Sequence, residues 1–204
     1  MNPCPKCGFA FGHPDKLPVE GIVTCPECGE RYPVPWLPLF VITGAGGSGK
    51  TTVSDRLFGR LEECLILQAD YLLQVRQTFD TWDEYWHFMI LQCMSLQRNE
   101  RPVVLEGWVN PSLIMNSHRI RFFSAVHILL LTCDAAAQTD RLEARNTRSR
   151  ENGQPESEIG MALTAAQVMR KEAEDFDNVT VLDTTNLTLE QTVDAAERWV
   201  RERL

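Results

Sequence analysis

The side chains best placed to do chemistry belong to one glycine-rich run, which consists of Gly44, Ala45, Gly46, Gly47, Ser48, Gly49, Lys50 and Thr51. The run fits the pattern G-x-x-x-x-G-K-[ST], and the apolar residues 39–42 precede it. A P-loop, or Walker A motif, needs this order of strand, glycines and helix start. Glycines let successive backbone N–H groups face one concavity, and the helix adds the positive end of its dipole. The run therefore predicts a phosphate-binding loop rather than a glycine-rich turn that binds nothing.

Two side chains of this loop and one from elsewhere could serve a nucleotide and its metal. Lys50 can reach the β- and γ-phosphates, and the Thr51 hydroxyl can hold Mg²⁺, with Thr52 beside it in the nucleotide site. The apolar run 103–105 ends at Glu106, before a glycine that allows close approach of the backbone. A carboxylate there could hold Mg²⁺ or its water shell, although it could also be a surface glutamate at a strand end. The pattern favours ATP and Mg²⁺ as ligands.

A second acidic residue follows the apolar run 64–69. Asp70 would lie across the γ-phosphate from the P-loop, where it could orient an acceptor hydroxyl and accept its proton. It could equally be the N-cap of whatever follows. The position opposite the phosphates favours the acceptor role.

Arginines gather in one stretch of this acidic chain. Arg141 and Arg145 stand four residues apart, so they project from one helix face. Arg148 and Arg150 lead into the polar residues 151–157. On a closing lid near 145–158 these side chains could neutralise the transferring phosphoryl group and exclude water. The alternative is a solvated helix end, where cations suit the helix dipole.

The seven cysteines fall into two groups. Two C-P-x-C-G knuckles contain the first group, which is Cys4, Cys7, Cys25 and Cys28. Their spacing predicts a four-thiolate structural Zn²⁺ site, because a redox dithiol needs only one C-x-x-C and a cytosolic chain rarely forms disulfides. So short a segment has too little core to fold without the metal. The second group, predicted to be buried and inert, is Cys64, Cys93 and Cys133.

The purpose of the N-terminal zinc ribbon is less specific. The ribbon has three basic and four acidic residues, so it lacks the excess of positive charge that binding to nucleic acid requires. His13 is interpreted as a surface or packing residue, and a closed thiolate site leaves no open metal position. We therefore expect packing or partner binding rather than catalysis. The charged residues are Lys6, Lys16, Arg31, Asp15, Glu20, Glu27 and Glu30.

Composition sets the outer bounds. With 204 residues, 44% of them hydrophobic, the chain can hold one α/β domain and a small module. Its net charge of −8 argues against a nucleic-acid coat, and no apolar run is long enough to cross a bilayer. The N-terminus also lacks the apolar region of a signal peptide, so we expect a cytoplasmic protein with no membrane partner. The domains expected are a zinc ribbon over 1–32, a proline-rich linker over 33–38 and an α/β domain over 39–204.

Beyond the linker, apolar strands alternate with helical patterns. Strands are expected over 39–43, 64–69, 102–106, 126–132 and 179–182. Helices are expected over 49–62, 81–99, 115–123, 134–146, 159–175 and 188–203, with capping-box spacing at Thr81–Glu84 and Thr188–Gln191. The strands are continuously apolar, as in a parallel sheet covered on both faces. Ligands then bind beyond the carboxyl ends of the strands.

On these residues the stretch 39–204 resembles the P-loop kinases of the nucleoside-monophosphate-kinase-like group, which includes adenylate, shikimate and gluconate kinases. The resemblance implies a three-layer sandwich whose five-stranded parallel sheet has the order 2-3-1-4-5, with ATP and Mg²⁺ bound. The run Asp140–Arg145 is similar to the start of the adenylate kinase lid, which implies Arg141 against adenine and Arg145 on the phosphates. The sequence Gln68-Ala69-Asp70 resembles the acceptor-binding motif of shikimate and gluconate kinases. The loop 183–186, with Thr185, would lie near the adenine.

The acceptor should bind between the second and third strands. Phe79, Trp82 and Trp86 repeat there at helical spacing, which favours a core-facing stripe over a ring that stacks on a nucleobase. Arg76 could hold a phosphate on the acceptor. The function expected is an ATP-dependent kinase acting on a nucleoside or nucleoside monophosphate, with Lys50, Asp70 and Arg145 as catalytic residues.

Other P-loop classes fit less well. No guanine-specificity motif N-K-x-D occurs, and the chain is short for a motor or transporter ATPase and lacks a signature sequence. The alternatives left open are a nucleotide-dependent switch whose ribbon engages a partner, and a kinase acting on nucleic-acid ends. Sparse positive charge on the ribbon argues against the second. The acceptor, the oligomeric state and the choice between ATP and GTP stay open at this point.

Overall fold

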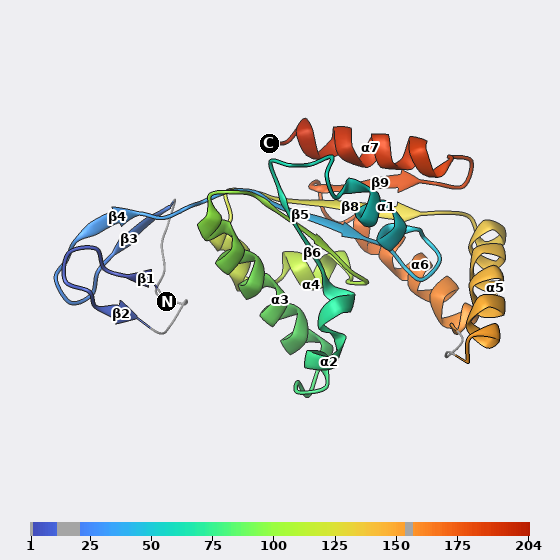
Figure 1. The fold of residues 1–204 in the computed structure, drawn as a ribbon, viewed down its shortest axis with the longest axis horizontal. Coiled ribbons are helices and arrows are strands. Elements are labelled where there is room, and N and C mark those ends of the chain that lie inside the picture. Colours follow the sequence, from blue (N-terminus) through green and yellow to red (C-terminus); the bar gives the residue numbers. More distant parts are fainter. Residues whose placement is uncertain (1, 12–20, 154–156) are drawn as a thin grey trace.

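The computed structural model describes residues 2–11, 21–153 and 157–204. A small N-terminal unit of short strands precedes a larger α/β part (Figure 1). The strands of the larger part are β5 (Leu39–Thr43), β6 (Leu65–Gln68), β7 (Val103–Glu106), β8 (Val126–Thr132) and β9 (Val179–Asp183). Its α-helices are α1 (Lys50–Leu57), α2 (Leu73–Arg76), α3 (Trp82–Leu96), α4 (Pro111–Met115), α5 (Ala135–Glu151), α6 (Ile159–Ala173) and α7 (Leu189–Arg201). Short 3-10 turns are η2 (Ala69–Leu72), η3 (Gln97–Asn99) and η4 (His118–Phe122).

The sheet has five parallel strands in the order β6-β7-β5-β8-β9. Counted along the α/β part, this is the predicted order 2-3-1-4-5, so the fold prediction is confirmed. Every residue of β5 and of β7 is buried, as their continuous apolar runs predict for strands covered on both faces. The register sets Glu106, the last residue of β7, between Ile42 on β5 and Gln68 on β6. The carboxyl ends of three strands therefore meet at one edge.

Helices cover both faces and complete three layers (Figure 1). On one face α1 and α7 pack against the sheet through a cluster that includes Phe40, Leu57 and Trp199. On the other face α3 and α4 bury a cluster that includes Tyr85 and Ile114. These two apolar layers hold the strand ends in place. Because helices bury both faces of the sheet, the edge formed by the carboxyl ends of the strands is where Glu106 and Gln68 come together.

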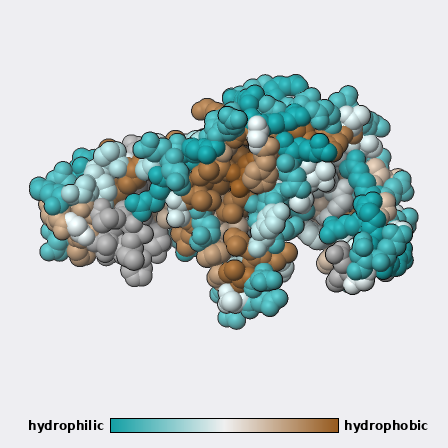
Figure 2. Space-filling model, in the orientation of Figure 1, coloured by the Kyte–Doolittle hydropathy of each residue, from teal (hydrophilic) through white to brown (hydrophobic). Residues whose placement is uncertain are grey.

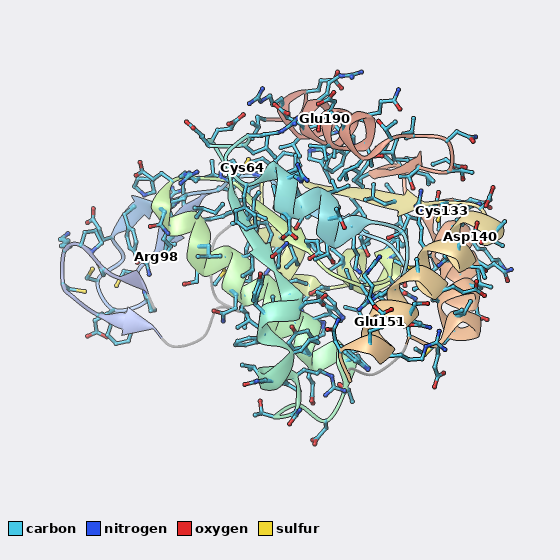
Figure 3. All side chains as sticks on the ribbon, turned by 45° about the vertical axis from the view of Figure 1, so that its right-hand side comes forward. Cys64, Arg98, Cys133, Asp140, Glu151 and Glu190 are labelled. Atoms are coloured by element: carbon cyan, nitrogen blue, oxygen red, sulfur yellow. The ribbon has the colours of Figure 1, made fainter. Side chains whose placement is uncertain are left out.

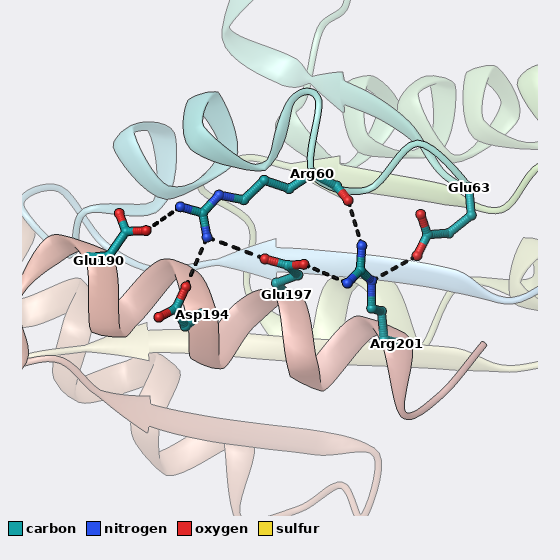
Figure 4. A network of polar contacts seen from close by, with 6 residues as sticks. All are labelled: Arg60, Glu63, Glu190, Asp194, Glu197 and Arg201. Carbon is teal, nitrogen blue, oxygen red and sulfur yellow. Dashed lines mark hydrogen bonds and ion pairs between the residues drawn. The ribbon is translucent and has the colours of Figure 1, made fainter.

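The helix α7 is also tied to the end of α1 by an ion-pair network (Figure 4). Arg60 donates to Glu190 and Asp194, and to Glu197, which also pairs with Arg201. Arg201 reaches back to the Arg60 carbonyl oxygen, with 2.7 Å between nitrogen and oxygen. These groups lie near the surface, so they orient the helix more than they stabilise the fold.

Some local predictions were wrong in extent. The range 115–123, expected to be one helix, holds only the last residue of α4 and the 3-10 turn η4, which Ser117 caps by accepting from the Arg119 N–H; most of α4 lies before this range. The helix expected to end at 146 continues to Glu151, so Arg148 lies within α5 rather than in a loop. The turn η2 and the helix α2 were not predicted. Both predicted capping boxes are present, at the starts of α3 and α7.

The N-terminal unit consists of two antiparallel pairs. These are β1 (Asn2–Pro3) with β2 (Ala10–Phe11), and β3 (Ile22–Thr24) with β4 (Arg31–Pro33). The connector to β5 is held at both ends, because the Val34 N–H donates to the Gly21 carbonyl and the Gln97 side chain donates to the Leu37 carbonyl. The ribbon residues His13, Asp15, Lys16 and Glu20, discussed above, lie outside the described residues.

In the part of the chain that the structure describes, none of the helices combines the length and the apolar composition that crossing a membrane requires.

Candidate active site

The loop between β5 and α1 has the backbone shape that a phosphate cradle needs. Gly47 has φ +81° and Gly49 has φ +92°, values that side-chain-bearing residues rarely adopt. A Cβ on Gly44 would lie 2.5 Å from the Leu131 carbonyl oxygen, so only glycine fits against β8 there. The helix α1 then begins at Lys50, immediately after the loop. Its unsatisfied N–H groups and dipole face the site where anions bind.

Helices α5 and α6 hold this loop from outside. The buried side chain of Gln138 donates to the Gly46 carbonyl at 2.7 Å and to the Ala162 carbonyl at 3.2 Å. It therefore links the P-loop, α5 and α6 through one amide. Sequence reasoning missed Gln138, since a glutamine inside a helix gives no signal of its contacts.

The carboxylate of Glu106 lies beneath the P-loop helix. Its side chain has no exposed area, and its Oε1 accepts from the Thr51 hydroxyl at 3.1 Å. The Lys50 ammonium lies 4.0 Å from the same oxygen, and its side chain is only 11% exposed. Burial raises the pKa of Glu106 and the negative charge of Asp70 adds to this effect, while Lys50 and the Thr51 hydrogen bond oppose it. Four predicted site residues thus influence one another at a single strand end.

The residues around Glu106 fit a bound Mg²⁺. Its second oxygen, Oε2, is buried and has no hydrogen-bond partner among the described residues. A buried unpaired carboxylate oxygen is costly unless a ligand or water satisfies it. With the Thr51 hydroxyl, it provides the hard oxygen donors that Mg²⁺ prefers. The neighbouring Thr52 is exposed on α1.

The end of β6 places the predicted acceptor acid beside this centre. The buried amide of Gln68 donates to the Ser54 hydroxyl and to Asp55, which fixes β6 against α1. Two residues later Asp70 is exposed, in the turn η2. The capping alternative is not observed, because the N-caps of η2 and α2 are Gln68 and Leu72. The carboxylate of Asp70 instead lines the pocket described below.

Arg141 lies between the P-loop and the loop after β9. It donates to the Thr184 hydroxyl at 3.0 Å and carbonyl at 2.9 Å, and to the Gly47 carbonyl at 3.5 Å. The Thr185 hydroxyl donates to Asp183 and accepts from the Asp134 N–H at 2.8 Å. These bonds bring the loop 183–186 beside the start of α5.

The lid arginines are less constrained. Arg145 is exposed, one turn beyond Arg141, and forms no hydrogen bond or ion pair with the described residues. The buried Asn146 exchanges hydrogen bonds with the Ser157 backbone, which connects α5 to the start of α6. Residues 154–156 of the predicted lid lie outside the described residues. A further arginine that the sequence analysis missed, Arg170, donates to the Cys133 carbonyl at 2.7 Å.

A pocket of about 890 Å³ opens beside Asp70. Its walls come from η2, α2, α3, the segment 108–116 and the start of α6. Glu172 on α6 accepts from Asn110 and from the Ser112 hydroxyl, which binds this segment to α6. The lining residues are Ala69, Asp70, Leu73, Trp82, Asp83, Tyr85, Trp86, His87, Trp108, Val109, Asn110, Ser112, Leu113, Asn116 and Met161.

Of the two tryptophans on α3 that were predicted to face the core, one is buried and the other is exposed in the pocket. Trp86 is buried and packs over Gly107, where an added Cβ would lie 2.4 Å from its ring. Tyr85 is also fully buried. Trp82, in contrast, is 53% exposed, because it begins the helix and extends past the sheet edge. The core interpretation was therefore wrong for Trp82, which lines the pocket instead.

The four knuckle cysteines come together in the N-terminal unit. All four sulfurs lie within 4.8 Å of one another, and the Cys4–Cys28 and Cys7–Cys25 distances are each 3.7 Å. Tetrahedral Zn²⁺ with Zn–S bonds of about 2.3 Å sets its sulfurs about 3.8 Å apart, whereas a disulfide needs about 2.05 Å. The arrangement fits a closed zinc site and excludes disulfides among these four.

The other three cysteines are buried, as predicted. Burial raises the pKa of Cys64 to about 11 and also raises the pKa values of Cys93 and Cys133. Figure 3 labels Cys64 near α7 and Cys133 at the end of β8 beside α5. Thiols of this kind are unreactive at neutral pH.

Comparison with known proteins identifies the fold. No protein-family model matches the sequence, and a search of curated proteins gives no match. Among solved structures, the chain is similar to the tunicamycin resistance protein of Deinococcus radiodurans, with TM-score 0.58 and 20% identity over 80% of this chain and 95% of that one. It is also similar to a gluconokinase from Sinorhizobium meliloti, with TM-score 0.56 and 15% identity over 83% and 94% of the two chains. A sugar kinase from Janibacter gives TM-score 0.52 and 17% identity over 82% and 95%. The chain thus has the fold of P-loop kinases.

Proposed function

We propose that this chain is an ATP-dependent kinase of the nucleoside-monophosphate-kinase-like group, which transfers the γ-phosphoryl group to a hydroxyl of a small molecule. One observation carries the proposal. The P-loop lysine, the threonine and a buried glutamate with an unpaired oxygen converge at the sheet edge where Asp70 faces a large pocket. The solved neighbours described as a gluconokinase and a sugar kinase support the class.

The chemistry follows from this arrangement. The acceptor oxygen attacks the γ-phosphorus of ATP, an O–P bond forms, and the bond from that phosphorus to the β–γ bridging oxygen breaks to leave ADP. Asp70 orients the acceptor hydroxyl and takes its proton. Lys50 and the loop amides stabilise charge on the phosphates, and Arg145 closes over the phosphoryl group. Bound Mg²⁺, held by Thr51 and Glu106, would neutralise further phosphate charge.

The nucleotide would lie along the P-loop with its base near Arg141 and Thr185. The hydrogen bonds of Arg141 to the Gly47 carbonyl and to the loop 183–186 support this position. The ribbon (1–32), the linker (33–38) and the kinase domain (39–204), with a lid near 145–158, make up the proposed organisation.

The test is a phosphoryl-transfer screen in which the protein receives ATP and one candidate acceptor at a time, and the release of ADP is measured. The candidates are nucleosides, nucleoside monophosphates, sugars and small acids. At least one acceptor should give multiple turnovers. Slow hydrolysis without any acceptor would favour the nucleotide-dependent switch instead. Asp70→Asn should reduce transfer by about 10²–10⁴-fold with ATP affinity unchanged. Asp80→Asn is the matched control, since Asp80 is exposed and does not line the pocket.

We also propose that the ribbon binds one structural Zn²⁺. The sulfur spacing supports this, and metal analysis of the purified chain should give one zinc per molecule. Cys28→Ser should release the metal and unfold the ribbon, whereas Cys64→Ala, outside the cluster, should retain it. Loss of zinc from both variants, or from neither, would contradict the assignment.

A further inference from the structure

Among the described residues, four aromatic residues line the pocket beside Asp70. Trp82, Tyr85, Trp86 and Trp108 all contribute to it. Leu73 and Met161 also line it, although they are 42% and 54% exposed. Figure 2 shows hydrophobic residues gathered over the face that carries α2 and α3. Exposed apolar side chains that gather at a cavity indicate a ligand with a broad apolar surface.

The charges in this pocket have one sign. Asp70 and Asp83 are its acidic residues, and no lysine or arginine occurs among the described residues that line it. Burial lowers the pKa of His87, and the neighbouring Arg119 and His118 lower it further, so its ring is uncharged at neutral pH. A phosphate group carries nearly two negative charges and is bound in proteins by arginine or lysine. Nothing described in this lining would pair with one.

Arg76, which the sequence suggested as a clamp for an acceptor phosphate, is engaged elsewhere. Its guanidinium carbon lies 4.4 Å from the centre of the Trp82 ring, and it donates to the Phe79 carbonyl at 2.7 Å. Its Nε is buried, and the residue is not among those that line the pocket. Arg76 therefore supports Trp82 rather than a ligand phosphate.

Trp82 is held in place although half of it is exposed. Arg76 lies over its ring, and the Tyr85 ring meets it edge-on with 5.9 Å between centroids. The Tyr85 hydroxyl in turn donates to the Ala69 carbonyl at 2.8 Å, next to Asp70. The stacking surface and the acceptor acid are thus connected through one buried tyrosine. A preorganised ring of this kind suits a flat aromatic ligand.

We propose that the acceptor is a hydroxyl compound without a phosphate of its own, and that a flat aromatic group of this compound stacks on Trp82 while its hydroxyl reaches Asp70. This rests on the proposed kinase function and narrows it. Of the two acceptor classes expected from the sequence, the aromatic lining and the acidic charge select the nucleoside over the nucleoside monophosphate.

The test compares matched pairs that differ by one phosphate. The full-length protein is saturated with ADP and Mg²⁺ so that its P-loop is filled, and tryptophan fluorescence is followed during titration. The probes are adenosine, guanosine, cytidine, uridine and thymidine with their 5′-monophosphates, and 1-naphthylmethanol with 1-naphthyl phosphate. At least one uncharged member should bind tenfold tighter or more than its phosphate partner. Equal or tighter binding of the phosphates, or no binding of any uncharged member, would overturn the proposal.

Two variants locate the binding. Trp82→Ala should weaken the preferred uncharged probe about tenfold, the effect typical of losing one stacking ring. Phe58→Ala is the matched control, because Phe58 is similarly exposed, at 52%, but lies at the end of α1. Asp83→Lys should raise the affinity for the monophosphates. An unchanged affinity in Trp82→Ala would exclude the stacking position.

Calorimetric titration with ADP and Mg²⁺ separates this proposal from the kinase function. If ADP binds and the phosphate compounds bind as tightly as their uncharged partners or more tightly, only the proposed class of acceptor is wrong. If no ADP binds to the folded, zinc-loaded chain, the kinase assignment itself fails.

Discussion

The proposed phosphate loop and the proposed acceptor pocket share one edge of the sheet but are built in opposite ways. The loop is a continuous run, 44–51, which would act through backbone N–H groups and a lysine beside a buried carboxylate. The pocket draws its walls from separate segments between residues 69 and 161, and most of them are aromatic or apolar. The proposed binding of phosphate is thus encoded locally, while the proposed binding of the acceptor depends on packing.

The largest effect should come from the phosphate side. Lys50→Ala removes the ammonium group that faces the phosphates, so turnover should fall about 10²–10³-fold with the fold intact. Initial rates of ADP formation measure this, and Lys171→Ala on α6 serves as the exposed-lysine control. Activity retained in Lys50→Ala would remove the P-loop from the mechanism.

A smaller loss should follow from changing the buried carboxylate. Glu106→Gln keeps an acceptor for Thr51 but removes the charge that would hold Mg²⁺ and its water, so activity should fall about 10–100-fold. Titration with Mg²⁺ should show a raised requirement for the metal. Glu62→Gln, at an exposed position outside the candidate site, is the control. An unchanged Mg²⁺ dependence would place the metal elsewhere.

The junction between the two regions can be tested by one methyl group. Gly107→Ala would place its Cβ 2.4 Å from the Trp86 ring and 3.0 Å from Ala69, so the free energy of unfolding should drop by about 1–3 kcal/mol. Because Trp86 lines the pocket, acceptor binding should weaken more than ADP binding. Gly160→Ala, with open space around its added methyl, should be neutral or slightly stabilising. Denaturant unfolding measures both variants.

The smallest expected effect depends on pH. The lowered pKa of His87 keeps it uncharged at neutral pH, and it gains a proton only below its ordinary value of 6.5. The facing groups are Arg119 and His118, which oppose protonation, and Asp83, which favours it. Between pH 7.5 and 5.5 the preference for uncharged probes over monophosphates should therefore narrow about threefold.

The same titration has a consequence for stability. Because the unfolded chain binds this proton more readily than the folded chain, the contribution of His87 to stability is present above pH 6.5 and is lost as the pH falls. His87→Gln should remove the stability effect and the share of the narrowing that belongs to His87, leaving only the part caused by protonation of the phosphates, whose second pKa is about 6. Fluorescence titrations and denaturant unfolding at the two pH values will show this. A preference that narrows equally in the variant would assign the effect to another group.

Much of the fold could be predicted from local patterns. Continuous apolar runs predicted the buried strands, and their alternation with helices predicted a parallel sheet. The order β6-β7-β5-β8-β9 was implied only by the resemblance to P-loop kinases. The approach of the knuckle cysteines followed from the two C-x-x-C pairs, and it is confirmed. The extent of α5 was not predictable, because the arginine-rich end of this helix has the polar composition of a loop.

The residues of the candidate site could be predicted where an acidic residue follows directly at the end of an apolar strand. Glu106 and Asp70 could be singled out for that reason, although their catalytic roles stay predictions. Gln138, Gln68 and Arg170 were missed, because each acts through a backbone carbonyl or a side chain that is distant in sequence. Trp82 was wrongly predicted to be buried, because helical spacing indicates which residues share a helix face but not how far along the helix that face is covered.

By itself, the sequence determined the phosphate loop, the parallel sheet and the thiolate quartet, since each depends on spacings within a few residues or on the period of apolar side chains. Only the tertiary structure decided that Glu106 is buried beside Lys50 with one oxygen unpaired among the described residues. It also decided that aromatic rings line the proposed acceptor pocket, with no lysine or arginine among the described residues that line it. The burial and the charge around a side chain depend on every segment that packs against it. Because these segments are distant in sequence, their combined effect produces no local sequence pattern.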